Sequence, residues 1–304
     1  MTTSVSEAGA GWIHGDKSRS ASSQQRSTAN SGSNKRNNGS SSKQPAVTTS
    51  PSVTGSATAV LPGVSSLLDL TSADKKEIAM RLVSTAENSS LDWRAQFSYI
   101  EDIGDGRGYT GGIVGFCSGT GDMLQLVQSY TATKPANPLA PYLSALKQVN
   151  GTELHTGLGD TFVAAWKLAA LDPAFQQAQE NLRDEVYFKP AVTMAKTDGL
   201  GALGQFAYYD AAVMHGPDAW GGGLPDIRKT ALASAKTPTQ GGDEKAYLQA
   251  FLTARKVEMS KESAHRDLTR ITGAQEKFLN AGNLGLQLPL TWSMYGDNFS
   301  ITSL

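Results

Sequence analysis

The chain contains few of the residues and segments that mark disulfide-rich, metal-binding or membrane proteins. Cys117 is the one cysteine among 304 residues, which excludes an intrachain disulfide. The four histidines have no zinc-ligand spacing and no HExxH sequence occurs, so we expect neither a metal ion nor a cofactor. No apolar run approaches the roughly 18 residues of a transmembrane helix. Residues 1–50 also lack a signal-peptide core, so no membrane partner is expected.

Net charge is scarce as well, but it is unevenly distributed. The formal net charge is −1. Residues 1–60 carry six of the 27 Lys/Arg and two of the 28 Asp/Glu, so the rest of the chain is mildly acidic. An acidic body argues against nucleic-acid binding and is compatible with a cationic partner.

Composition divides the chain into two parts. Residues 1–66 are dominated by Ser, Thr, Asn, Gly and Gln, which bury too little apolar surface to offset the entropy of ordering, so we expect a disordered tail. Residues 67–304 are expected to form the folded, catalytic domain. Its first helix is predicted to start at Thr71, with Asp74 completing a capping box, and to end near Glu87.

The rest of this domain reads as mostly helical with little sheet. Residues 99–103 and 111–117 have the pattern of strands around a loop that contains three glycines. Apolar periodicity and loop residues predict helices at 123–130, 138–149, 161–170, 174–183, 191–196, 202–215, 226–236, 243–259 and 261–272. The predicted fold class is therefore α+β, predominantly α-helical, with one small β-sheet.

Two carboxylates near the first helix suggest acid–base chemistry. Glu87 ends a largely apolar helix, where partial desolvation favours a general acid. Asp105 lies between two glycines in a loop that should be open, where a solvated carboxylate suits a general base. Thr110 is placed to orient a water for Asp105. This set matches the needs of inverting glycoside hydrolysis, although a helix-end Glu and a turn Asp also occur as plain surface residues.

Longer segments resemble one known family. They are AENSSLDW (86–93), YIEDIGDGRGYTGG (99–112), GFCSGTGD (115–122), GQFAYYDA (204–211), MHGP (214–217), TPTQGGDE (237–244) and FLNAGNL (278–284). Together they closely resemble the chitosanases of glycoside hydrolase family 46. The resemblance covers roughly residues 70–304.

The resemblance implies a lysozyme-like fold with two lobes around a substrate cleft, and a secreted, monomeric enzyme. It implies inverting, endo-acting hydrolysis of chitosan, a polycation. Glu87 corresponds to the general acid, Asp105 to the general base and Thr110 to the residue that holds the attacking water.

Further positions take roles from the same resemblance. Those expected to contact sugar are Asp122, Glu262, Tyr99, Arg107 and His215. A supporting ion-pair network behind Glu87 is expected from Asp210, Arg255 and Arg270. Arg266 departs from the family, which often has an acidic residue there, so sugar binding at that outer position is in question.

Other readings are kept open. Hydrolysis of another amino-sugar polymer such as peptidoglycan follows from the implied architecture, and a non-catalytic chitosan-binding protein would have a miswired pair. The GxGxxG at 199–204 lacks a preceding strand and is better explained as a helix entry. Trp93, Trp166 and Trp292 are expected to be core residues rather than sugar-stacking platforms.

Overall fold

The computed structural model describes residues 69–219, 221–261 and 267–304. The predicted tail, residues 1–66, lies outside the described residues, and so do Glu262 and Arg266. Among the described residues, no helix is both long and apolar enough to cross a membrane.

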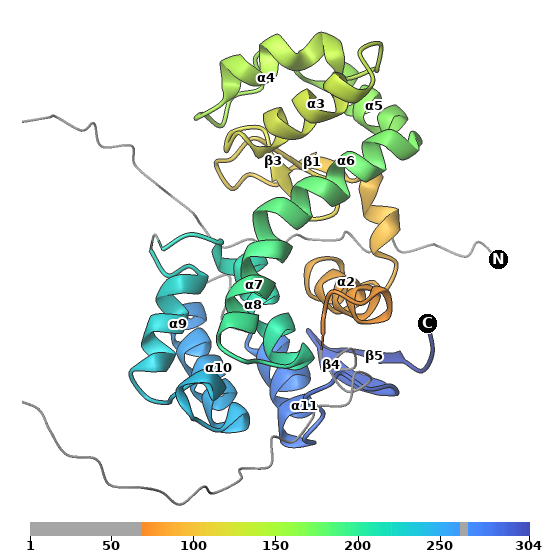
Figure 1. The fold of residues 1–304 in the computed structure, drawn as a ribbon. Coiled ribbons are helices and arrows are strands. Elements are labelled where there is room, and N and C mark those ends of the chain that lie inside the picture. Colours follow the sequence, from red (N-terminus) through yellow and green to blue (C-terminus); the bar gives the residue numbers. More distant parts are fainter. Residues whose placement is uncertain (1–68, 220, 262–266) are drawn as a thin grey trace, which may run out of the picture.

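The described chain forms two lobes (Figure 1). The upper lobe consists of β1 (Ile100–Asp102), β2 (Tyr109–Gly111), β3 (Phe116–Cys117), α3 (Asp122–Thr133), α4 (Leu143–Val149) and α5 (Asp160–Ala169), with the short segments η1 (Trp93–Ser98) and η2 (Ala140–Tyr142). The lower lobe consists of α2 (Ala73–Asn88), α7 (Lys189–Thr197), α8 (Ala202–His215), α9 (Leu224–Leu232), η4 (Pro238–Gln240), α10 (Glu244–Ser260), η6 (Arg270–Gln275), α11 (Glu276–Asn280), β4 (Leu290–Met294) and β5 (Asp297–Ile301).

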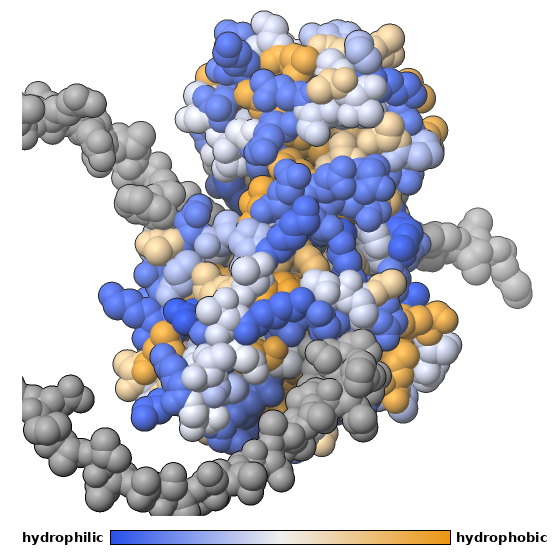
Figure 2. Space-filling view, in the orientation of Figure 1, coloured by the Kyte–Doolittle hydropathy of each residue, from blue (hydrophilic) through white to orange (hydrophobic). Residues whose placement is uncertain are grey.

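One long helical element connects the lobes. α6 (Pro173–Arg183) runs down from the upper lobe, continues through the π-helical segment η3 (Asp184–Phe188) and becomes α7 (Figure 1). The space-filling view shows the two masses narrowing where they join (Figure 2). The chain changes lobe here without leaving helical conformation.

Each lobe has an aromatic core. In the upper lobe, the Trp166 ring on α5 packs edge-on against Phe175 of α6 at 5.0 Å between centroids. In the lower lobe, Trp292 of β4 packs against Phe278 at 6.3 Å. Trp93, Trp166 and Trp292 are 5%, 0% and 1% exposed, which confirms that they are core residues.

Helix α8 forms the centre of the lower lobe. Every residue from Ala202 to Met214 is buried, as expected for a helix that is apolar on nearly all sides. α8 follows helix α7 rather than a strand, so the GxGxxG is the entry to a helix, as predicted. A side chain at Gly204 would lie 2.7 Å from Leu200 Cβ, so the glycine is required by close packing.

The sheet predicted near the front of the chain is confirmed, and a second one was not expected. β2 pairs antiparallel with β1 and β3, and Thr110 lies directly opposite Cys117. The expected single strand over 111–117 is wrong, because Gly112 and Gly115, at φ 77° and 69°, turn the chain between β2 and β3. The second sheet is the C-terminal hairpin of β4 and β5.

Two predicted helix boundaries are also wrong. α2 begins after Ser72 rather than Thr71, and the Ser72 hydroxyl donates to Asp74 instead of capping the backbone. The helix expected over 261–272 does not form as one unit, since Asp267 Oδ1 accepts the Thr269 N–H at 2.8 Å and starts a new helical segment.

We predict that Gly273→Ala destabilises the lower lobe. An added Cβ would overlap the carbonyl oxygen of Ser293 on β4, so η6 or the hairpin has to shift. The expected loss is about 2–4 kcal/mol in the free energy of unfolding, the range for overpacked or displaced cores. Denaturant unfolding measures it, with the exposed neighbour Thr272→Ala as the control. Equal stability of the two variants would contradict this packing argument.

Candidate active site

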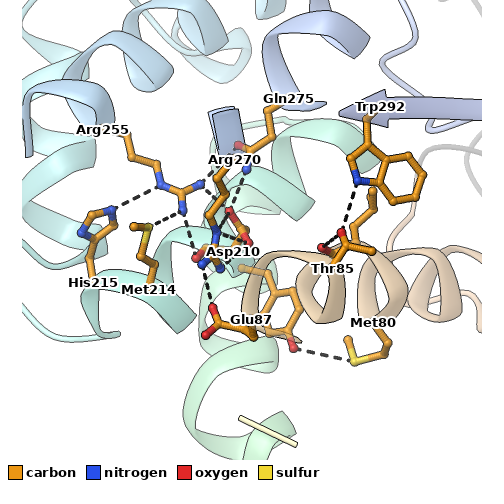
Figure 3. A network of polar contacts seen from close by, with 12 residues as sticks. Met80, Thr85, Glu87, Asp210, Met214, His215, Arg255, Arg270, Gln275 and Trp292 are labelled. Atoms are coloured by element: carbon orange, nitrogen blue, oxygen red, sulfur yellow. Dashed lines mark hydrogen bonds and ion pairs between the residues drawn. The ribbon is translucent and has the colours of Figure 1, made fainter. Parts of the chain in front are cut away.

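Glu87 is a buried carboxylate at the end of α2. It is 5% exposed, which confirms the expected desolvation, and the helix stops two residues later at Ser89 with φ 49°. Its Oε1 accepts a hydrogen bond from Arg270 Nη1 at 2.7 Å (Figure 3). The carboxylate therefore meets a guanidinium that comes from a distant part of the chain.

Asp210 of α8 is the centre of the network behind Glu87. It is 1% exposed, and its Oδ1 accepts from Arg270 Nη2 at 2.7 Å. Its Oδ2 lies 2.6 Å from Arg255 Nη1. All three predicted network residues are thus assembled and buried (Figure 3). With Glu87 ionised, the two acids balance the two guanidinium groups, which limits the cost of burying four charges.

Gln275 belongs to the same network, although the sequence analysis missed it. Its Nε2 donates to Asp210 Oδ2 at 2.7 Å, and its Oε1 accepts from Arg255 Nη1 at 3.3 Å. Residues five apart on an α-helix point about 140° away from each other. Arg270 and Gln275 are the two ends of the π-helical segment η6, whose wider turn brings them onto the same face. No sequence pattern signals that change of pitch.

The network sets the ionisation of Asp210. Burial raises the pKa of this carboxyl, but the adjacent Arg270 and Arg255 outweigh it and hold the pKa well below its usual range. Burial lowers the pKa of Arg270, whereas Asp210 and Glu87 raise it, and the net result is well above the ordinary value. Asp210 and Arg270 therefore stay charged as a pair.

Asp105 lies in the upper lobe, in the loop between β1 and β2. Its side chain is 15% exposed, so the expectation of an open, solvated carboxylate is wrong. Arg107 covers it: the Arg107 Nε donates to Oδ2 at 2.7 Å and its backbone N–H donates to Oδ1 at 3.1 Å. The glycines on either side, both at positive φ, curl the loop and let Arg107 turn back on Asp105.

Thr110 and Asp122 lie close to this pair. Thr110 is fully buried on β2, and its Oγ1 is 3.4 Å from Cys117 Sγ. Asp122, the first residue of α3, accepts the Cys117 N–H at 2.9 Å, and burial raises the pKa of its carboxyl. The charges of Asp105 and Asp122 both act on Arg107. The upper lobe thus gathers two carboxylates around one cation.

Two tyrosines at the lobe junction connect the upper and lower groups. Burial raises the pKa of Tyr187 on η3, and Asp122, Cys117 and Arg107 also act on it. Burial likewise raises the pKa of Tyr209 on α8, where Asp210 and Glu87 contribute. Tyr187 and Tyr209 act on each other as well. The two groups therefore approach a common point where α6 passes between the lobes.

The remaining predicted residues lie at the edges of these groups. Tyr99, before β1, donates its hydroxyl to Glu101. His215, the last residue of α8, accepts from Arg255 Nε at 3.4 Å (Figure 3). Glu262 lies outside the described residues, so its role stays a prediction. Among the described residues, no group of three or more His, Cys, Asp or Glu is arranged to hold a metal ion.

A mainly helical, two-lobed protein with one acid on each lobe is a lysozyme-like glycoside hydrolase by class. The particular family follows from comparison with known proteins. The chain belongs to glycosyl hydrolase family 46, whose model matches residues 81–290. It is 64% identical over 229 residues to a chitosanase of Streptomyces sp. (strain N174), covering 75% of this chain and 82% of that protein. A chitosanase of Bacillus subtilis (strain 168) is 35% identical over 63% of this chain and 70% of its own length.

Solved structures agree with this assignment. The co-crystal structure of chitosanase OU01 with substrate superposes with a TM-score of 0.75 at 55% identity, covering 77% of this chain and 99% of that one. The complex of the Gynuella sunshinyii GH46 chitosanase with chitotetraose gives a TM-score of 0.70 at 32% identity, covering 76% and 99%. The predicted family and fold class are confirmed.

We predict that Asp210→Asn destabilises the protein in a pH-dependent way. At neutral pH the change leaves two buried guanidinium groups undercompensated, at a cost of about 3–5 kcal/mol. Because the folded pKa of Asp210 is lowered, its stabilisation is complete above the ordinary carboxyl pKa of about 4 and is lost as the pH falls through the lower folded value.

Unfolding free energies at pH 7 and pH 3 measure this effect. The difference between the original protein and Asp210→Asn should be larger at pH 7. Asp297→Asn, at an exposed aspartate of β5, is the control and should change stability little at either pH. A gap of the same size at both pH values would show that the charge of Asp210 is not its source.

Proposed function

We propose that this protein cuts chitosan internally at its β-1,4 bonds and inverts the anomeric configuration. The observation that carries the proposal is the family membership, together with relatives that are chitosanases and are solved with substrate or chitotetraose. The acids on separate lobes support it, because an inverting hydrolase needs carboxyl groups on opposite faces of the sugar ring.

In the proposed reaction, Glu87 gives its proton to the leaving glycosidic oxygen. Asp105 takes a proton from a water on the other face of the ring, and Thr110 holds that water. The water oxygen bonds to the anomeric carbon as the glycosidic bond breaks, so the product forms with inverted configuration. The Asp210–Arg270 pair orients Glu87, since Arg270 Nη1 fixes one of its two oxygens.

The unliganded arrangement has to change before this reaction. Both oxygens of Asp105 are engaged by Arg107, and Thr110 has no exposed surface. We therefore propose that Arg107 turns to the incoming sugar, which frees Asp105 and makes room for a water beside Thr110. Closure of the two lobes on the substrate brings the acids to the reacting bond.

Charge supports chitosan over neutral polymers. A glucosaminium unit is a cation, and Asp122 lies beside Asp105 on the upper lobe, where its charge attracts it. Tyr99, Arg107, His215 and Glu262 are proposed as further sugar contacts. Because a polysaccharide does not cross a membrane, the proposal places the enzyme outside the cell, acting as a monomer without nucleic acid or membrane partners.

Removing either acid should abolish hydrolysis. Glu87→Gln and Asp105→Asn are each expected to lower kcat on chitosan by about 10²–10⁴, the range for loss of a general acid or base. Reducing-end release measures the rate, and NMR of early products of the original protein should show the α-anomer first. Glu153→Gln, at an exposed residue of the upper lobe, serves as the control and should keep full rate.

The same assay separates the alternatives. A variant that keeps the original rate would lose its proposed role. Retention on chitosan without any product would favour a non-catalytic binding protein. Faster hydrolysis of peptidoglycan than of chitosan would favour a different amino-sugar polymer.

Asp122 is expected to recognise the charge of the substrate. Asp122→Asn should raise KM on fully deacetylated chitosan by about tenfold, near the value of one charge-assisted hydrogen bond. The effect should shrink on more acetylated polymer, because fewer units carry an ammonium group. A KM increase of the same size on every substrate would instead indicate a disturbed α3 terminus, where Asp122 accepts the Met123 N–H.

A further inference from the structure

Cys117 is a buried thiol that the proposed reaction does not use. It is 2% exposed and lies on β3 directly opposite Thr110 in the antiparallel register. Its Sγ has two polar neighbours: Thr110 Oγ1 at 3.4 Å and the carbonyl oxygen of Gly115 at 3.2 Å. Burial and the nearby Asp122 raise the pKa of this thiol to about 11, so the sulfur carries its proton near neutral pH.

The directions of these two hydrogen bonds follow from counting protons. The carbonyl oxygen of Gly115 carries no proton, so the thiol must be the donor in that contact. A thiol has one proton to give. In the contact with Thr110, the sulfur is therefore the acceptor and the Thr110 hydroxyl is the donor.

We propose that Cys117 is a positioning residue that fixes which way the Thr110 hydroxyl points. The role rests on the proposed function of Thr110 as the holder of the attacking water. With its proton committed to the sulfur, Thr110 Oγ1 offers only lone pairs, so a water bound there must donate to it.

This direction suits the reaction. A water that donates one proton to Thr110 and the other to Asp105 has both protons committed, and its remaining lone pair is free to attack the anomeric carbon. If Thr110 instead donated to the water, it would occupy the lone pair needed for attack. The thiol therefore selects the productive orientation before the substrate arrives, which is preorganisation by a neighbouring hydrogen bond.

The test compares variants at 117 in two backgrounds of the full chain. Cys117→Val fills the site without an acceptor, and Cys117→Ala removes the sulfur outright. Both should lower kcat on chitosan by about 3- to 10-fold, the rate equivalent of one neutral hydrogen bond, with KM nearly unchanged. Cys117→Ser restores a group that both donates and accepts, so its kcat should lie closer to that of the original protein.

The second background is Thr110→Ala. There the hydroxyl is gone, so Cys117→Val should cause no further loss of kcat. Equal losses in both backgrounds would overturn the proposal and indicate disturbed packing. Full kcat in Cys117→Val and Cys117→Ala would overturn it as well.

The outcomes remain distinct from failure of the proposed function. If Thr110→Ala alone keeps the original kcat, Thr110 does not hold the water and the role of Cys117 falls with it, whereas chitosan hydrolysis itself stands or falls with Glu87→Gln and Asp105→Asn. Val149→Ala, a buried change on α4 in the same lobe, controls for packing and should leave kcat unchanged even where stability drops.

Discussion

The buried contact between Glu87, Arg270 and Asp210 is the constraint on which the rest of the structure depends. It joins three distant segments, α2, α8 and η6, at the end of the lower lobe that faces the lobe junction. Breaking such a network by removing one partner leaves an uncompensated buried charge, which costs far more than losing a surface pair. The same contact holds Glu87 where it can protonate a glycosidic bond, so stability and proposed catalysis share one set of side chains.

The two lobes divide the chemistry. The lower lobe holds its acid rigidly, by a guanidinium that is itself fixed by Asp210 and, through Asp210, by Gln275. The upper lobe holds its acid in a curled glycine loop, where Arg107 covers Asp105 until a cationic sugar competes for it. A rigid proton donor and a base released on binding suit an enzyme whose substrate is a charged chain.

Much of this arrangement was predictable from the sequence, but unevenly. α2, α8 and the buried tryptophans follow from apolar periodicity, and the long resemblance identified every member of the ion network except Gln275. The errors lie where a local rule competes with another group: glycines at positive φ divided the strand expected over 111–117, and Asp267 restarted a helix inside 261–272. The solvated state expected for Asp105 failed because Arg107, two residues away, folds back on it.

The sequence alone determined the family, the residue types at the reacting positions and the helical character of the domain, because these depend on composition, order and spacing along the chain. Only the tertiary structure decided which charges meet. The wider turn of η6 sets Arg270 and Gln275 on one face, and the β2–β3 register sets Cys117 against Thr110. Such contacts depend on helix pitch and strand register, which are set by packing across the whole lobe.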